Sequence, residues 1–357
     1  MKWMVGIWMG MACGMAAAQP WTVFEAGKEG YHTFRIPAVV LAKDGGLLAF
    51  CEARKNDRKD HGDIDLVVKR SGDAGKTWST LRVLHDGGGD GPVTMGNPAP
   101  VVDETGKVHL VFCRNNSEVL YLSSDDHGAT WSEPKEITQG LRKDGWGWYA
   151  TGPGHGIQLS EGKQKGRIII PANHRFGAQG DDKGSYGAHS IFSDDSGKTW
   201  QLGFIGGEAN GIHPNENTAA ELPAADGRSR VLFNVRNNKG ENPNGRAAVV
   251  SVDGGQTVTG DFTAIGTIDA PACQGSSLRG RNGRIFFTSP RGKKRENLTL
   301  WISSDEGKTW IAGETIHAGP AAYADIVEVH QDIVGVLFEN GVKESYERIS
   351  FQNVLVK

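Results

Sequence analysis

The chain contains little cysteine, four residues among 357. Cys13 lies in an apolar N-terminal segment, and the other three, Cys51, Cys113 and Cys273, are odd in number and far apart. This spacing gives no indication of a disulfide framework. Cys51 and Cys113 each close an apolar run of strand character, so we expect both to be buried free thiols.

Three other features are missing. The net charge is −3 and no long basic run occurs, which gives no support for nucleic-acid binding. Apolar residues at the 3.6-residue spacing of a helix are hard to find after the N-terminal segment. The eleven histidines show no metal-ligand spacing, so no metal or other cofactor is predicted. With 50 glycines and 14 prolines, this is the composition of a turn-rich, all-β protein.

The N-terminus has the pattern of a secretory signal. Lys2 precedes an apolar segment, residues 3–12, and three alanines end at Ala18. The segment is too short to span a membrane. We therefore expect residues 1–18 to be a signal peptide and residues 19–357 to be exported, as a secreted or periplasmic protein. Lipid attachment at Cys13 is the less favoured alternative, because Gly10-Met11-Ala12 matches such a site poorly.

The most informative feature is an octapeptide, Ser-x-Asp-x-Gly-x-x-Trp. It occurs as Ser71–Trp78, Ser124–Trp131, Ser193–Trp200 and Ser303–Trp310. The last gap is about twice as long as the others and contains a degenerate copy, Ser251–Val258, in which Val replaces Trp. A fixed pattern that recurs at a mean interval of 58 residues indicates an array of similar structural units.

Each copy follows a run of strand character and leads into another extended stretch. The Asp can accept backbone hydrogen bonds within a turn, and the Gly can supply a positive φ. We therefore interpret these Asp residues as elements that hold hairpin turns, without a chemical role.

The repeat interval predicts the architecture. The 339 residues after the signal contain a little under six such intervals, and units of this length with several strands each are typical of a β-propeller. We predict an all-β, six-bladed β-propeller of one domain, in which each blade is a four-stranded antiparallel sheet. The sixth blade would be closed by N- and C-terminal strands, with residues 349–355 as the candidate last strand.

Phe34-Arg35-Ile36-Pro37 places an arginine directly before an apolar strand. Together with the octapeptides, this segment resembles the bacterial exo-α-sialidase, or neuraminidase, family with Asp-box (BNR) repeats, similar to glycoside hydrolase family 33. The resemblance covers essentially the whole chain after the signal. It implies a glycoside hydrolase that acts on terminal sialic acid.

The resemblance also implies a substrate-binding set of arginines from different blades. Three would bind the carboxylate of sialic acid: Arg35, Arg236 and Arg295, with Arg291 as the alternative to Arg295. Planar guanidinium groups bind carboxylates with directional, charge-assisted hydrogen bonds. Arg54 would help to line the pocket.

The family pattern pairs a tyrosine nucleophile with a glutamate, an exception to the usual two-carboxylate scheme. Tyr323 matches the tyrosine and Glu221 matches the glutamate, with Glu216 as the alternative. A free tyrosine has a pKa near 10, so Glu221 would act as its base. Tyr346 is predicted to be a core strand residue.

The remaining role is the acid that protonates the leaving oxygen and later activates water. The charged segment 52–65 offers several aspartates, and the family spacing from Arg54 selects Asp60. Asp57 and Asp63 stay open as alternatives.

Together these features predict a retaining exo-α-sialidase that binds sialylated glycans and forms a covalent tyrosyl intermediate. The alternatives are a propeller that binds sialic acid without cleaving it, and a transsialidase or an enzyme that releases an anhydro sugar. No nucleic-acid partner and no membrane span are expected.

Overall fold

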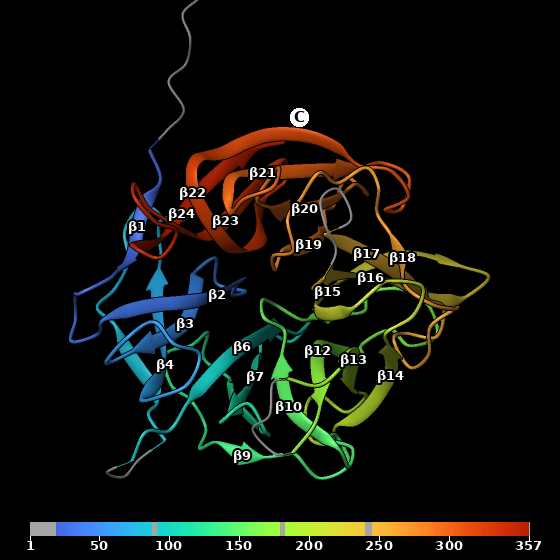
Figure 1. Ribbon diagram of the computed structural model, residues 1–357, viewed down its shortest axis with the longest axis horizontal. Coiled ribbons are helices and arrows are strands. Elements are labelled where there is room, and N and C mark those ends of the chain that lie inside the picture. The colour runs from blue at the N-terminus through green and yellow to red at the C-terminus, as the bar shows by residue number, and fades with distance from the viewer. Residues whose placement is uncertain (1–18, 88–90, 179–182, 240–244, 357) are drawn as a thin grey trace, which may run out of the picture.

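The computed structural model describes residues 19–87, 91–178, 183–239 and 245–356. These ranges contain strands and turns and no helix, so the prediction of an all-β protein is confirmed. The predicted signal, residues 1–18, lies outside the described residues. In Figure 1 the sheets follow one another in chain order around a common centre.

Four sheets have four strands in their main path, each pairing antiparallel with the next. The first sheet consists of β2 (Thr33–Leu41), β3 (Leu47–Arg54), β4 (Ile64–Ser71) and β5 (Arg82–His85). The second consists of β6 (Met95–Val102), β7 (Val108–Arg114), β8 (Glu118–Ser124) and β9 (Lys135–Glu136). The third consists of β10 (Trp146–Thr151), β12 (Ile168–Phe176), β13 (Tyr186–Ser193) and β14 (Gln201–Gly207), with β11 (Ile157–Gln158) beside β12. The fourth consists of β15 (Pro214–Ala225), β16 (Arg228–Asn237), β17 (Arg246–Ser251) and β18 (Thr263–Ala264).

The last sheet has seven strands, because one long strand pairs with different neighbours along its two halves. Its strands are β19 (Ser276–Arg279), β20 (Ile285–Ser289), β21 (Glu296–Ser303), β22 (Ile311–His330), β23 (Ile333–Asn340), β24 (Arg348–Leu355) and β1 (Trp21–Glu25). The first half of β22 pairs with β21, and its second half pairs with β23. Two groups of four antiparallel strands therefore share β22.

The two ends of the described chain meet in this sheet. β1 pairs antiparallel with β24, and Trp21 lies opposite Phe351. The predicted pairing of an N-terminal strand with residues 349–355 is confirmed. Phe24 of β1 is fully buried in a cluster that also contains Phe34 of the first sheet. The N-terminal strand thus connects the last sheet to the first.

The octapeptides are turns closed by side-chain hydrogen bonds. In the second copy the Ser124 hydroxyl donates to Asp126 Oδ1 (2.8 Å), and the Thr130 amide donates to the same oxygen (2.7 Å). The Thr130 hydroxyl donates to Asp126 Oδ2 at 2.5 Å, and Gly128 has φ 87°. The same contacts recur around Asp73, Asp195, Asp253 and Asp305. The interpretation of these Asp residues as turn-holding groups is confirmed.

The tryptophans of the octapeptides also link neighbouring sheets. Trp131 packs edge-on against Phe50 of the first sheet, with ring centroids 5.9 Å apart. Trp78 packs in the same way against Phe351 of the last sheet, at 5.6 Å. Apolar side chains of adjacent sheets fill the space between them, as in the cluster that joins the first sheet to the second.

Near the centre, one buried carboxylate connects several sheets. Asp325 of β22 accepts the backbone N–H of Val39 (2.8 Å) from β2 and the hydroxyl of Ser276 (2.6 Å) from β19. It also accepts from the amide and ring nitrogen of His155, at 3.1 and 2.7 Å. Asp325 lies two residues after Tyr323, so these contacts fix the strand that carries the predicted nucleophile.

Two further expectations concern the described residues. Cys51, Cys113 and Cys273 are buried free thiols. Across the described ranges no helix has the length and apolarity needed to cross a membrane.

Candidate active site

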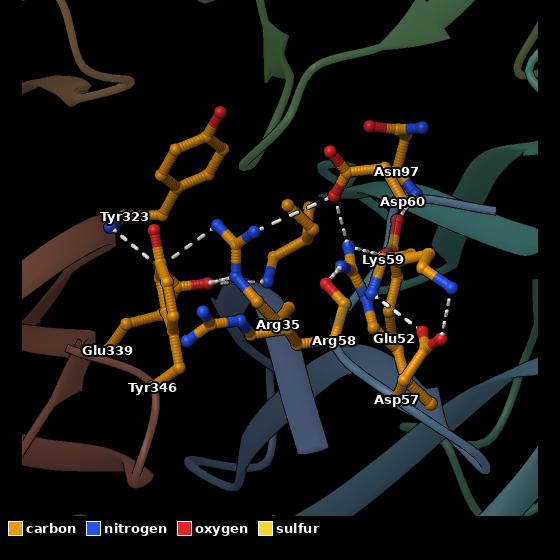
Figure 2. A network of polar contacts seen from close by, with 12 residues as sticks. Arg35, Glu52, Asp57, Arg58, Lys59, Asp60, Asn97, Tyr323, Glu339 and Tyr346 are labelled. Atoms are coloured by element: carbon orange, nitrogen blue, oxygen red, sulfur yellow. Dashed lines mark hydrogen bonds and ion pairs between the residues drawn. The ribbon is translucent and has the colours of Figure 1, made fainter. Parts of the chain in front are cut away.

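Arg35 lies at an irregular point of β2 where the backbone is strained. A β-bulge falls between Arg35 and Ala38, and Ile36 has φ 60°, a conformation that is unfavourable for a β-branched residue. The buried Glu339 of β23 holds this strain, since it accepts the Ile36 amide at 3.0 Å and Arg35 Nε at 2.9 Å. Glu339 also accepts the Tyr323 amide at 3.0 Å, so one carboxylate positions both predicted site residues (Figure 2).

Sequence reasoning missed Glu339. Its signal was a single acidic residue at the end of an apolar strand, where a buried charge requires a partner.

Tyr323 is buried, and its hydroxyl donates to Glu216 and accepts from Arg236 Nη1 at 3.1 Å. Arg236 Nη1 also donates to Glu216 Oε2 at 2.9 Å. Burial and then the Glu216 carboxylate raise the pKa of Tyr323 well above its ordinary value, although the neighbouring arginines oppose the shift. The phenol therefore carries its proton and has a carboxylate in place to receive it.

The structure does not bring Glu221 to Tyr323; it places the alternative, Glu216, there instead. Glu221 accepts the amides of Ser160 and Glu161, and it lines a different cavity, of about 480 Å³. Both glutamates belong to β15, but five residues of strand span roughly 16 Å. Glu221 therefore lies much farther along β15 than the end that reaches Tyr323.

Arg295 also faces Tyr323, whereas its alternative does not. The Arg295 guanidinium lies 5.5 Å from the centre of the Tyr323 ring and donates to the Tyr346 hydroxyl at 2.8 Å. Arg291 is about half exposed and lies over Trp301 of its own sheet. The structure thus places Arg295, the residue preferred from the sequence, beside Tyr323.

Tyr346 is not a core strand residue, contrary to the sequence-based expectation. It lies in the turn between β23 and β24, and its ring lies 4.2 Å from the Arg35 guanidinium. The turn directs the side chain toward the site, so Tyr346 contacts two of the predicted carboxylate-binding arginines.

Asp60 reaches the arginines from the loop between β3 and β4. Its Oδ1 lies 2.8 Å from Arg54 Nη2 and 3.6 Å from Arg35 Nη1, while 62% of the side chain is exposed (Figure 2). Partial desolvation favours the protonated acid, but the charges of Arg54 and Arg35 outweigh it and hold the pKa of Asp60 below its ordinary value. The alternatives Asp57 and Asp63 pair instead with Lys59 and Lys55, at 2.9 and 3.0 Å.

These groups meet at a cavity of about 200 Å³. Its lining includes Asp60, Glu216, Arg236 and Tyr323. The other lining residues are Asn97, Trp148, Ala150, Asn173, Arg175, Tyr186, Asn215 and Asn238. Sequence reasoning assigned no role to these residues, because they come from several separate strands and loops and none belongs to a local motif. Nowhere in the described ranges do three or more His, Cys, Asp or Glu side chains gather as metal ligands would.

The arrangement combines three chemical elements. Guanidinium groups like those around Tyr323 can bind a carboxylate, and a phenol that donates to a carboxylate, as Tyr323 does to Glu216, can act as a nucleophile with its base. Asp60 supplies a carboxyl group on the same cavity as Tyr323.

Comparisons with known proteins identify the family of the chain. A family model for a BNR repeat-like domain matches residues 45–336. An exo-alpha-sialidase of Aspergillus fumigatus is 32% identical over 317 residues, which cover 77% of this chain and 69% of the relative. The chain belongs to the sialidase family. Sialidases are glycoside hydrolases, so the predictions of the family and of an enzyme are confirmed.

Solved structures extend the likeness to the fold. The Hadza microbial sialidase Hz136 superposes with a TM-score of 0.79 at 26% identity, over 94% of this chain and 68% of that one. The intramolecular trans-sialidase from Ruminococcus gnavus superposes with a TM-score of 0.74 over 94% of this chain and 97% of that one. At 16% identity, the second likeness concerns the fold alone.

Proposed function

We propose that this protein is a retaining exo-α-sialidase that releases terminal sialic acid from glycoproteins, glycolipids or oligosaccharides. The observation that carries the proposal is the hydrogen bond from Tyr323 to Glu216, formed beside Arg35, Arg236 and Arg295 and on the same cavity as Asp60.

The three arginines bind the carboxylate of the sugar. Arg35 and Arg236 are buried or nearly so, and their own partners are Glu339 and Glu216. Guanidinium donors that are fixed in advance bind a carboxylate with little loss of side-chain freedom. They place the anomeric carbon, which bears that carboxylate, at Tyr323.

The first step forms a bond between Tyr323 Oη and the anomeric carbon. Glu216 takes the phenolic proton, Tyr323 attacks, and the glycosidic bond breaks as Asp60 gives its proton to the leaving oxygen. A neutral phenol approaches a carbon that bears a carboxylate without the repulsion that an Asp or Glu nucleophile would meet.

The second step reverses the proton transfers. Asp60, now a carboxylate, takes a proton from water, and the water oxygen attacks the anomeric carbon. The bond to Tyr323 Oη breaks, and Glu216 returns the proton to the phenolate. Two displacements at the same carbon retain its configuration.

The proposal includes the architecture of a six-bladed β-propeller. The seven-stranded sheet supplies two blades that share β22, and the four other sheets supply one blade each. The circular succession of sheets in Figure 1 supports this count.

The proposal also includes export after cleavage of residues 1–18, which rests on the sequence pattern of that segment. N-terminal sequencing of the mature protein would then begin at Gln19. An N-terminus at Met1 would contradict export by this route.

Replacement of the nucleophile tests the mechanism. The Tyr323→Phe variant removes one oxygen and should abolish turnover of a fluorogenic sialoside, while sialic acid binding remains. Tyr346→Phe is the matched control, since it removes a hydroxyl that contacts Arg295 but not Glu216. Substantial turnover by Tyr323→Phe would exclude the nucleophile assignment. Sialoside binding without any released sugar by the wild-type protein would instead favour a non-catalytic binding protein.

The products distinguish hydrolysis from its alternatives. Mass spectrometry of the reaction with sialyllactose should show free sialic acid and lactose. An anhydro sugar or a sialylated acceptor would identify a transsialidase that uses the same residues.

A further inference from the structure

Glu52 of β3 is a buried carboxylate that the proposed mechanism does not use. It is 3% exposed, and its Oε2 accepts Arg54 Nε at 3.1 Å and Arg54 Nη2 at 2.6 Å. Its Oε1 accepts the Asn97 amide of β6 at 3.0 Å. Burial raises the pKa of Glu52, although Arg54 opposes the shift. Arg54 contacts Asp60, and Asn97 lines the cavity. The positions of both residues thus depend on the side chain of Glu52.

The geometry at Glu52 repeats that at Glu339. Glu339 accepts hydrogen bonds from Arg35 and from the backbone of Ile36, which has a positive φ and precedes a proline. Glu52 holds Asn97, which has φ 57°, precedes a proline and lies at a β-bulge. In both cases the glutamate belongs to the second strand of a group of four, β3 in the first sheet and β23 in the group that begins with β22, and its backbone partner belongs to the first strand of the next sheet. Glu52 therefore occupies the place in the first sheet that Glu339 occupies in the last.

Arg54 lies between two carboxylates. Its side chain is only 2% exposed, and its Nη2 contacts both Glu52 Oε2 and Asp60 Oδ1, at 2.6 and 2.8 Å. Figure 2 labels the two carboxylates, Glu52 on the strand β3 and Asp60 on the loop that follows it. One positive charge is thus shared by a buried partner and an exposed one.

We propose that Glu52 is a positioning residue for Asp60: it fixes Arg54 in place and offsets the charge that Arg54 exerts on the acid. This proposal rests on the proposed role of Asp60 as the proton donor. An acid that faces an unshared guanidinium ion would keep its proton less readily.

The charges that face Asp60 determine the direction of the effect. They are Arg54 of β3, Arg35 of β2 and His61 of the same loop, all of which favour the ionised acid. Substrate binding supplies a carboxylate to Arg35, which leaves Arg54 as the main cation beside Asp60. Without Glu52, the charge of Arg54 would act on Asp60 alone. The pKa of Asp60 would then fall.

Glu52→Gln tests this proposal through the pH dependence of kcat for sialyllactose. Asp60 must hold a proton in the first step and lack it in the second, so a lower pKa moves both limits of the profile to lower pH. We expect a shift of about one pH unit, the size typical of a lost neighbouring charge. Glu306→Gln is the matched control, because Glu306 forms a similar two-contact pair with Arg230 outside the cavity. Its profile should coincide with that of the wild type.

A double variant, Glu52→Gln with Arg54→Met, guards against misfolding, since it removes the buried pair together. Loss of Arg54 favours the protonated acid, so its profile should lie at higher pH than that of Glu52→Gln. A uniform loss of kcat at every pH, or two profiles at the same position, would overturn the proposal in favour of a purely structural role.

Leaving-group dependence separates this proposal from the proposed function. Asp60→Asn should lose turnover of sialyllactose much more than turnover of an aryl sialoside, whose leaving group needs no proton. If Asp60→Asn treats both substrates alike, the assignment of Asp60 as the acid fails. If Asp60→Asn behaves as expected while the Glu52→Gln profile does not move, only the role of Glu52 fails.

Discussion

At the residue scale, each of three arginines at the site pairs with a different glutamate. Arg35 pairs with Glu339, Arg54 with Glu52 and Arg236 with Glu216, at 2.6 to 2.9 Å. The glutamates therefore reduce the electrostatic repulsion among the arginines before any substrate enters, and they fix the orientation of each guanidinium group. A buried charge without a partner would be strongly unfavourable, so these glutamates are needed for the site to form.

The first prediction concerns the two glutamates of β15. Glu216→Gln should lower kcat/KM by about 100- to 10,000-fold, because it removes the base for Tyr323. Glu221→Gln is the matched control, five residues away on the same strand, and it should retain nearly all activity. Steady-state kinetics with a sialoside measures both variants. The opposite ranking would return the role of base to Glu221.

The choice between these residues shows where sequence reasoning stopped. The family pattern located the segment 215–222 but not the right glutamate within it. The Asp226-Gly227 turn carried the missing information. It joins the antiparallel strands β15 and β16, so residues at equal distances before and after the turn lie opposite each other, and residue 216 or 217 falls opposite Arg236. The sequence predicted Tyr323, Arg35 and Asp60, which the structure brings together. Glu339 and Glu52 belong to apolar strands and lack any local motif.

At the element scale, the octapeptide joins turn formation to packing between sheets. Its Asp and Ser close the turn, and in three copies the Trp indole N–H donates to the Gly carbonyl. The residue before that Gly also has a positive φ in each copy, for example 59° at His127. Hydrogen bonds to the Asp carboxylate hold this two-residue left-handed segment in place.

The second prediction follows from the turn hydrogen bonds. Those from Thr130 and Ser124 lower the pKa of Asp126 to about 2, from an ordinary 3.8. This carboxylate therefore contributes stability above pH 3.8, and the contribution is lost as the pH falls through 2. Asp126→Ala should lower the thermal midpoint at pH 6, and the difference from wild type should shrink at pH 2.

The control for this prediction is the adjacent residue. Asp125 is largely exposed and pairs with Lys107, at 3.4 Å. Asp125→Ala should change the thermal midpoint little at either pH. Equal effects of the two substitutions would show that the turn hydrogen bonds contribute nothing specific.

The strands were predictable at this scale, but their irregularities were not. Alternating apolar runs and Asp-Gly turns locate the antiparallel hairpins. The bulges that follow Arg35 and Gly96 depend on carboxylates from neighbouring sheets, which no local sequence pattern reveals. These bulges present the functional side chains, so the parts least visible in the sequence position the chemistry.

At the scale of the whole molecule, the proposed ring of sheets closes through the short strand β1. It adds to β24, and its Phe24 packs against Phe34 of the first sheet. The site uses residues from the first, fourth and last sheets, at Arg35, Arg236 and Tyr323. A variant in which β1 no longer joins the last sheet to the first should therefore lose its active site together with its stability.

The third prediction tests this closure. Phe24→Ala removes a fully buried ring and should reduce the free energy of unfolding by about 3–5 kcal/mol. Ile311→Ala, at a side chain that is 74% exposed, should change it by less than about 0.5 kcal/mol. Denaturant titration measures both values. A small effect of Phe24→Ala would show that β1 is dispensable for closure.

The central claim is that Tyr323 forms a covalent bond to the sugar. A 2,3-difluorosialic acid probe tests it most directly, because its anomeric fluoride leaves readily while the second fluorine slows breakdown of the intermediate. Mass spectrometry of the intact protein should show the addition of one fluorosialyl group, and peptide mapping should locate it at Tyr323. An enzyme that turns over sialosides but carries no adduct, or carries it on another residue, would contradict the account.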